Sequence, residues 1–111
     1  MNALRNKVQL IGNVGNDPEI RNLEGGKKVA NLTIATHDSY KNDKGEKVEQ
    51  TEWHRVVAWG KTAEIIEKFV TKGKEIAIEG KLTHRSYDDK NGEKRYITEV
   101  LVNDILLLGN K

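Results

Sequence analysis

Strand-like runs fill this chain, and only one segment has helical periodicity. Residues alternate in character over three runs before the helix, at 6–14, 28–36 and 50–60. Two further strands are expected at 75–87 and 96–102, with a short closing one at 105–108. The order of three strands, one helix and two strands restricts the folds open to 111 residues.

The single helix is expected at residues 63–72. Its apolar stripe, predicted to be core, consists of Ala63, Ile66, Phe69 and Val70. Thr62 is placed to cap its start, and Gly73 stands where a C-terminal cap glycine belongs. The helix is therefore short and amphipathic.

Turn-forming residues separate the strands. The first strand ends at Asn16-Asp17-Pro18, and Gly25-Gly26 predicts a hairpin turn feeding the second. Asn91-Gly92 is a hairpin signal between the last two long strands. Residues 37–49 are polar and lysine-rich around Gly45, which predicts a long loop.

This element order is that of the oligonucleotide-binding (OB) fold, a five-stranded Greek-key barrel. A closed barrel also leaves few open strand edges in a chain with so many short strands. A five-stranded sandwich has nearly the same pattern and stays open as an alternative. The expected class is mainly β, an OB-fold with one short helix between strands 3 and 4, forming a single domain over residues 1–111.

Composition restricts the class of protein further. No apolar run approaches the roughly 20 residues of a membrane helix, and the N-terminus lacks the apolar centre of a secretory signal. The absence of cysteine excludes disulfides, thiolate metal sites and cysteine nucleophiles. A cytoplasmic location is expected. The net charge of +2 is too small to indicate a nucleic-acid partner by itself.

Both tryptophans lie in the run at residues 50–60. Alternation along a strand puts five of its side chains on one face, namely Thr51, Trp53, Arg55, Val57 and Trp59. Two indoles and a guanidinium can stack planar groups and attract negative charge, which predicts a surface for bases on a phosphate backbone. The alternative is that the indoles fill the core, since tryptophans are usually largely buried.

The fourth strand supports the surface interpretation, because Tyr87 shares its parity with Lys81 and Arg85. Tyr40 is a lone aromatic in the expected loop, and Tyr96 lies on the second arm of the last hairpin. The cations that could follow the phosphates are Arg5, Lys7, Arg21, Arg55, Lys61, Lys72 and Arg85. Each taken singly is typical of a solvated surface charge, so their shared faces carry the prediction.

No catalytic or metal site is expected. The histidines at 37, 54 and 84 lack metal-ligand spacing, and Asp88-Asp89 belong to a turn. Ser39 and Ser86 have no base arranged for nucleophilic attack. His54 points away from the tryptophan face, which favours a buried or subunit-contacting role.

The chain resembles the bacterial single-stranded DNA-binding protein family over essentially its whole length. The resembling segments are NKVQLIGNVGNDPE at 6–19, VANLTIAT at 29–36, QTEWHRVV at 50–57, KG at 72–73, IEGKL at 78–82 and YITEV at 96–100. Of these, the tryptophan-containing segment is the most specific. Several motifs in the same order and spacing carry the resemblance.

The resemblance implies an OB-fold homotetramer, built from dimers, that wraps single-stranded DNA with little sequence preference during replication, recombination and repair, in the bacterial nucleoid. The family's stacking positions correspond to Tyr40, Trp53, Trp59 and Tyr87, and its subunit contact to His54. Protomers are expected to pair through the first strand, where Val8 and Leu10 lie. No cofactor, metal or membrane partner is implied.

Two departures from the family pattern bear on function. Tyr40 and Tyr87 stand where members often carry tryptophan, so weaker stacking is expected there. Familiar members continue into a flexible tail with an acidic tip that recruits replication and repair proteins, whereas this sequence ends at Lys111. Recruitment through such a tip is therefore not expected.

Three other functions stay open at this point. A primosome-type OB protein would bridge DNA and a helicase loader, and an oligomeric scaffold would use the barrel without nucleic acid. An OB-fold nuclease would bind a metal through the hairpin acids. Binding to oligo(dT) and stability of the strand with divalent ions would separate these from a DNA-binding protein.

Overall fold

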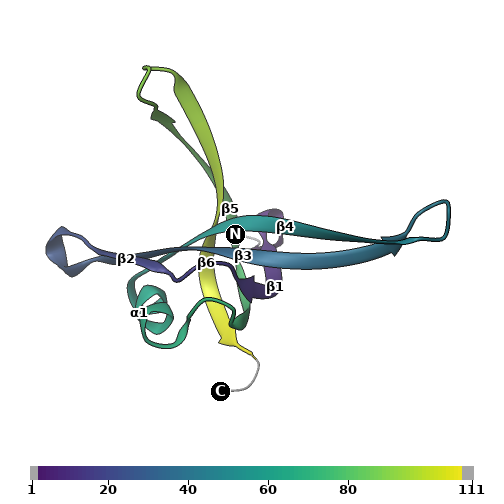
Figure 1. Ribbon diagram of the computed structural model, residues 1–111. Coiled ribbons are helices and arrows are strands. Elements are labelled where there is room, and N and C mark those ends of the chain that lie inside the picture. The colour runs from purple at the N-terminus through teal and green to yellow at the C-terminus, as the bar shows by residue number, and fades with distance from the viewer. Residues whose placement is uncertain (1–2, 109–111) are drawn as a thin grey trace.

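The computed structural model describes residues 3–108; residues 1–2 and 109–111, at the two ends of the expected domain, lie outside it. Figure 1 shows a small barrel from which two long hairpin arms project. The strands are β1 (Val8–Val14), β2 (Glu19–Asn22), β3 (Lys28–Lys41), β4 (Lys47–Trp59), β5 (Glu75–Asp88) and β6 (Lys94–Leu107). The helices are α1 (Gly60–Phe69) and two 3-10 turns, Ala3–Asn6 and Glu24–Gly26.

Five of the strands close into a barrel. Strand β1 pairs with β5, β5 with β6, and β4 with β3, all antiparallel, while β6 and β4 run parallel. Closure comes from β1 returning to β3, where Asn13 lies opposite Ala35 and Val14 opposite Ile34. The predicted five-stranded Greek-key OB barrel is therefore confirmed, and the alternative of a five-stranded sandwich is wrong.

Strand alternation fills the barrel. On β3, Ala30, Leu32 and Ile34 point inward and are buried. The other strands contribute the inward-facing Val14, Val56, Ala58, Ile76, Ile78, Val100 and Val102. Helix α1 covers the barrel through Ala63 and Ile66, with Val70 just beyond its end. The apolar core is thus confined to the barrel and its helix.

A register shift shapes the β5–β6 pair. Glu79 lies opposite Asp104 and Gly80 opposite Val102, so Asn103 is an extra residue on β6. A Cβ at Gly80 would come within 2.0 Å of the Leu101 carbonyl oxygen, so only glycine fits at this crossing. Strand β6 continues through the bulge to Leu107, so the separate closing strand predicted at 105–108 is wrong and residues 105–107 are the end of β6.

The polar loop predicted at residues 37–49 is wrong. Strands β3 and β4 stay paired as far as Lys41 opposite Lys47, which makes this segment an arm of the barrel. No core lies behind the arm, so its side chains lack the apolar alternation from which a strand is predicted. Strand β2, which pairs with the start of β3, was also not predicted.

The helix differs from its prediction at both ends. It begins at Gly60 without a side-chain cap, so Thr62 is inside it, and it ends before Gly73. Gly73 instead lies in the following turn with φ +91°, and its N–H donates to the Val14 carbonyl. Phe69 is 57% exposed, because only one side of this short helix meets the barrel; its predicted core position is wrong. No helix of residues 3–108 is long and apolar enough to cross a membrane.

Candidate nucleic-acid interface

The outer face of β4 carries the two tryptophans. Trp53 is 63% exposed and Trp59 is also exposed, whereas Val56 and Ala58 between them are fully buried on the inner face. The predicted orientation of this strand is confirmed. The alternative in which the indoles fill the barrel is wrong.

The Trp53 indole lies against the start of the chain's first turn. A Cβ at Gly15 would stand 2.3 Å from the Cζ3 atom of Trp53 and 2.8 Å from the Thr33 hydroxyl. Hydrogen bonds hold the residues next to the ring in place. Asn16 Oδ1 accepts one from the backbone N–H of Thr33 at 2.9 Å and one from the Thr33 hydroxyl at 2.8 Å. The ring edge is thereby supported while the indole stays exposed.

A groove runs beside the tryptophan strand, and we call it the central groove. One part, of about 370 Å³, is lined by Asn16, Glu19, Arg21, Asn31, Leu32, Thr33, Arg55, Arg85 and Glu99. The other, of about 460 Å³, is lined by Arg21, Leu23, Val29, Asn31, Val57, Trp59, Thr83, His84, Arg85, Glu99 and Leu101. The two parts share Arg21, Asn31, Arg85 and Glu99, so they form one continuous surface.

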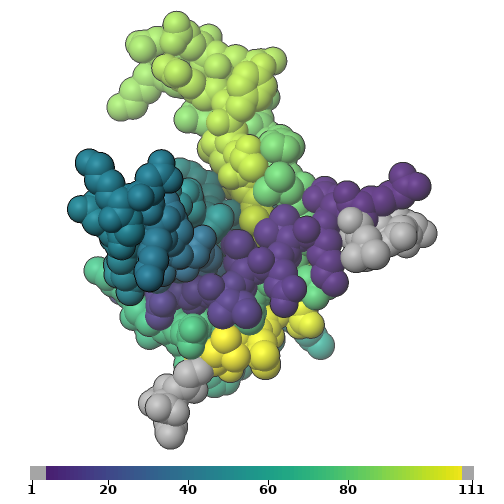
Figure 2. Space-filling model, turned by 90° about the vertical axis from the view of Figure 1, so that its right-hand side faces the viewer, coloured from purple at the N-terminus to yellow at the C-terminus, as the bar shows by residue number. Residues whose placement is uncertain are grey.

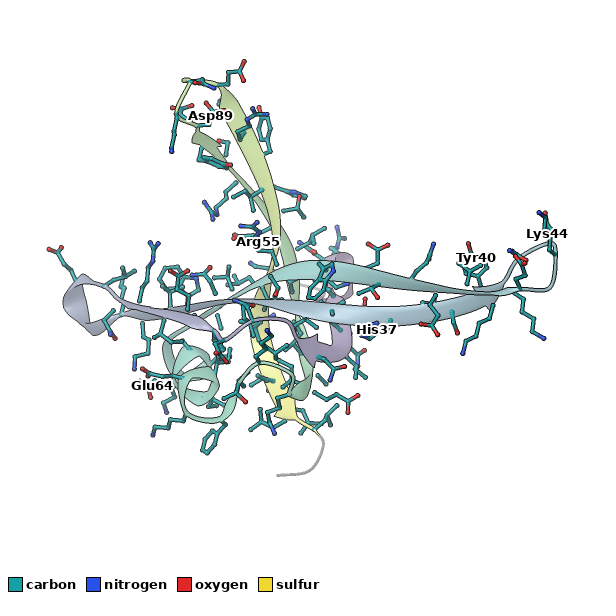
Figure 3. All side chains as sticks on the ribbon, in the orientation of Figure 1. His37, Tyr40, Lys44, Arg55, Glu64 and Asp89 are labelled. Atoms are coloured by element: carbon teal, nitrogen blue, oxygen red, sulfur yellow. The ribbon has the colours of Figure 1, made fainter. Side chains whose placement is uncertain are left out.

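Three of the seven predicted cations gather in this groove: Arg21 from β2, Arg55 from β4 and Arg85 from β5. Figure 3 shows Arg55 at the barrel, where the two arms come together. The structure does not bring the other four to the groove. Arg5 lies in the N-terminal 3-10 turn, Lys7 pairs with Glu79 at 3.6 Å, Lys61 is on α1, and Lys72 follows the helix.

A carboxylate that sequence reasoning missed lies among the arginines. Glu99 is only 7% exposed, and its two oxygens accept hydrogen bonds from Nε and Nη2 of Arg85 at 3.1 and 3.3 Å. The hydrogen bond to Glu99 and its negative charge raise the pKa of Arg85 above its ordinary value. Only the β5–β6 register, which sets Glu99 opposite Thr83, brings the two side chains together.

The tyrosines of the β5–β6 arm lie on opposite faces. Tyr87 has the strand parity of Arg85, and Tyr96 lies across from Ser86 on the other face. Both are exposed, Tyr96 to 75%. Of the two, only Tyr87 therefore continues the face that lines the central groove.

Tyr40 stands apart from the tryptophans. Figure 3 shows it toward the end of the β3–β4 arm, near Lys44 and far from Arg55. Its strand parity is that of Ile34, whereas Trp53 lies opposite Ala35 on the other face of the ribbon. Tyr40 therefore does not share the strand parity of Trp53, and it does not line either part of the central groove.

His37 is a further aromatic on the tryptophan face that sequence reasoning missed. It lies opposite Thr51, and its Nδ1 is 3.0 Å from the Thr51 hydroxyl oxygen. The side chain is exposed, and its pair with Thr51 is the next pair on the same face of the ribbon after that of Trp53 with Ala35. Had residues 37–49 been predicted as strands, the parity of His37 with Ala35 would have placed His37 on the tryptophan face.

The predicted interface residues do not line the groove. His54 is half-buried, with Nε2 2.9 Å from the Thr36 hydroxyl. Val8 and Leu10 pack, partly buried, against the core of their own barrel. The next residue of β1, Ile11, points outward instead and is exposed.

An OB barrel with exposed indoles beside an arginine-lined groove defines the class of nucleic-acid-binding modules that accept unpaired strands. Residues 5–108 match the model of the single-strand binding protein family. The chain belongs to that family.

Similar proteins agree with this membership. The chain is 50% identical over 107 residues to "Single-stranded DNA-binding protein 1" of Chlorobaculum tepidum, covering 96% of this chain and 66% of that protein. It is 48% identical over 110 residues to "Single-stranded DNA-binding protein 1" of Xylella fastidiosa, covering 98% of this chain and 81% of that one. The solved Plasmodium falciparum SSB complex with ssDNA superposes with a TM-score of 0.87 at 33% identity, covering 94% and 95% of the two chains.

Proposed function

We propose that this protein binds single-stranded DNA with little sequence preference and protects it during replication, recombination and repair. The observation that carries the proposal is the pair of exposed indoles, Trp53 and Trp59, on the strand beside a groove with three arginines. Bases in a duplex are stacked on one another and cannot lie on protein indoles. An unpaired strand offers both its base faces and its phosphates.

The two named relatives and the solved complex support DNA as the strand. Stacking depends little on which base is present, since every base has a π-face, so sequence preference should be weak. Trp53, Trp59 and Tyr87 are the proposed stacking residues beside the groove, with Tyr40 on the β3–β4 arm. Arg21 and Arg55 are the proposed phosphate contacts within the groove, and Arg5, Lys7, Lys61 and Lys72 are outlying candidates.

Self-association into a homotetramer is part of the proposal. Strand β1 pairs with β5 along Val8–Asn13, but among the described residues its other edge pairs with β3 only at Asn13 and Val14. Figure 2 shows this strand at the surface beside the end of β6. An open edge favours antiparallel pairing with a second copy.

An outward apolar row adds to this edge. Ile11, Ala77 and Leu106 stand side by side on β1, β5 and β6, and Leu106 is 62% exposed. A second copy seated on this row would bury it. His54 is a second proposed subunit contact, on β4. The proposed location is the cytoplasm, on nucleoid DNA.

Titration with oligo(dT) tests the binding function. Tryptophan fluorescence should fall as the strand covers the indoles, and affinity should fall with salt, because phosphate contacts release counterions. Trp53→Ala should weaken binding by roughly 1–3 kcal/mol. Unchanged emission at low salt and at every oligomer concentration would remove this function and favour the scaffold.

The remaining alternatives give different results in the same samples. Native mass measurement with and without the oligomer reports assembly and stoichiometry together. Degradation of a labelled strand with magnesium or calcium would favour the nuclease, but family membership supports a binding protein. A primosome-type protein would require a helicase-loading partner in addition to the strand.

A further inference from the structure

The central groove has a charge pattern that simple attraction of phosphate does not explain. Two of its arginines, Arg21 and Arg55, make no ion pair with a carboxylate among residues 3–108. The third, Arg85, is held by two hydrogen bonds to Glu99. One groove therefore contains both unpaired and paired guanidinium groups, although a second carboxylate, Glu19, also lines its 370 Å³ part.

The position of Glu99 makes the difference between the paired and the unpaired arginines important for binding. It lines both parts of the groove, yet its side chain is almost entirely buried. The Glu99 carboxylate is paired with the more exposed Arg85 guanidinium, so the pair has little net charge and attracts a phosphate only weakly. A neutral base does not depend on such attraction.

The paired guanidinium group suits a base better than a phosphate. Glu99 offsets its charge and occupies two of its N–H groups, while about half of the Arg85 side chain stays exposed. A fixed planar guanidinium stacks on aromatic rings. Three apolar side chains, Val57, Trp59 and Leu101, line the same part of the groove beside its polar residues.

We propose that Glu99 is a positioning residue that sets the orientation of the bound strand, with bases toward Arg85 at the floor and phosphates toward Arg21 and Arg55. Arg85 is then a base-stacking residue and not a phosphate contact. This inference rests on the proposed single-stranded DNA binding and adds how the groove distinguishes the two sides of the strand.

The test compares an oligo(dT) strand with an abasic strand of equal length over a range of salt concentrations. In Glu99→Gln, the freed Arg85 charge should engage a phosphate. The slope of log K against log salt should then become more negative by about 0.7, the value for one phosphate on a single strand. The preference for oligo(dT) over the abasic strand should fall several-fold.

A remote glutamate provides the matched control. Glu64 lies exposed on α1, away from the groove, so Glu64→Gln removes the same charge without touching Arg85 (Figure 3). It should leave slope and preference as in the unaltered protein. Equal behaviour of the Glu99 and Glu64 variants would overturn the inference. Failure of the unaltered protein to bind oligo(dT) at low salt would instead overturn the proposed function itself.

A double variant covers the case in which Glu99→Gln does not fold. Arg85→Gln with Glu99→Gln replaces a charged pair by a neutral one of similar size. Oligo(dT) affinity should fall roughly fivefold or more, as for loss of one stacked base, with an unchanged salt slope. A slope shallower by about 0.7, or an unchanged affinity, would show that Arg85 does not act on bases and would overturn the inference.

Discussion

Trp53 lies so close to Gly15 that a single carbon added to the glycine would stand 2.3 Å from the ring. The contact joins the turn after β1 to the outer face of β4, at the edge of the central groove. It fixes where the indole lies without burying it. The position of a stacking residue on one strand is thus decided by a glycine almost forty residues earlier.

Replacing Gly15 by alanine should therefore displace the Trp53 indole. Gly15 does not have a positive φ, so the backbone accepts a side chain and the ring must move. We expect oligo(dT) affinity to fall by about 1–3 kcal/mol, as in Trp53→Ala, measured by anisotropy of a labelled strand. Gly26→Asn is the control, since that position has open space and asparagine tolerates its φ of +78°. Equal affinities for both variants would contradict the prediction.

The two tyrosines of the β5–β6 arm should differ in their contribution to binding. Tyr87 shares the face of Arg85, and Tyr96 occupies the other face. Tyr87→Ala should weaken oligo(dT) binding by roughly 1 kcal/mol or more, whereas Tyr96→Ala should have little effect. Titration of both variants at one salt concentration measures the difference. A larger loss for Tyr96→Ala would place the strand on the opposite face of the arm.

The apolar row on β1, β5 and β6 should control assembly. A charge at Leu106 would have to be buried in a subunit contact, which is costly without a partner. Leu106→Glu should therefore lower the mass seen by native mass spectrometry or sedimentation. Phe69→Glu is the matched control, because Phe69 is similarly exposed but lies on α1. If only Phe69→Glu dissociates the assembly, the subunit contact lies on the helix and not on the apolar row.

The tip of the β5–β6 arm predicts a pH dependence. At the β5–β6 tip, hydrogen bonds from the Glu93 N–H and from Arg95 lower the pKa of Asp89. A lowered folded-state pKa stabilises the turn above the ordinary aspartate pKa, and this stabilisation is lost as pH falls through the lowered value. The turn should stay formed at neutral pH and loosen in acid.

The β3–β4 tip has the same turn with an amide in place of the carboxylate. Asn42 Oδ1 accepts from the N–H groups of Lys44 and Glu46, as Asp89 Oδ1 does from Asn91 and Glu93. The amide NMR signal of Gly92 should change as pH falls through the lowered pKa of Asp89. Asp89→Asn, which makes this turn like that of Asn42, should remove that change. Retention of the full change in the Asp89 variant would contradict the assignment.

Strand alternation was enough to predict most of the barrel and the outward tryptophans. Ala30, Leu32 and Ile34 alternate with polar residues, and such a pattern has one stable orientation when one face is buried. The arm at residues 37–49 was predicted as a loop because this alternation is absent there. With no core behind it, both faces are polar, and cross-strand hydrogen bonds leave no mark in composition.

The helix showed the limit of periodicity. Ala63, Ile66, Phe69 and Val70 recur at helical spacing, but Phe69 is exposed, because a ten-residue helix meets the barrel along a narrow stripe. The spacing of apolar residues shows which side of the helix faces the barrel. Which of those residues are buried depends on how the helix packs against the barrel.

The sequence by itself determined the order of the five barrel strands and the helix, the faces of β4 and the family, since these follow from local alternation, turns and motifs. Only the tertiary structure decided which charges meet. Arg21, Arg55 and Arg85 come from three strands, and Glu99 reaches Arg85 from a fourth. Such a groove depends on strand register and barrel closure, which join residues far apart in the chain. The same closure places Gly15 beneath Trp53.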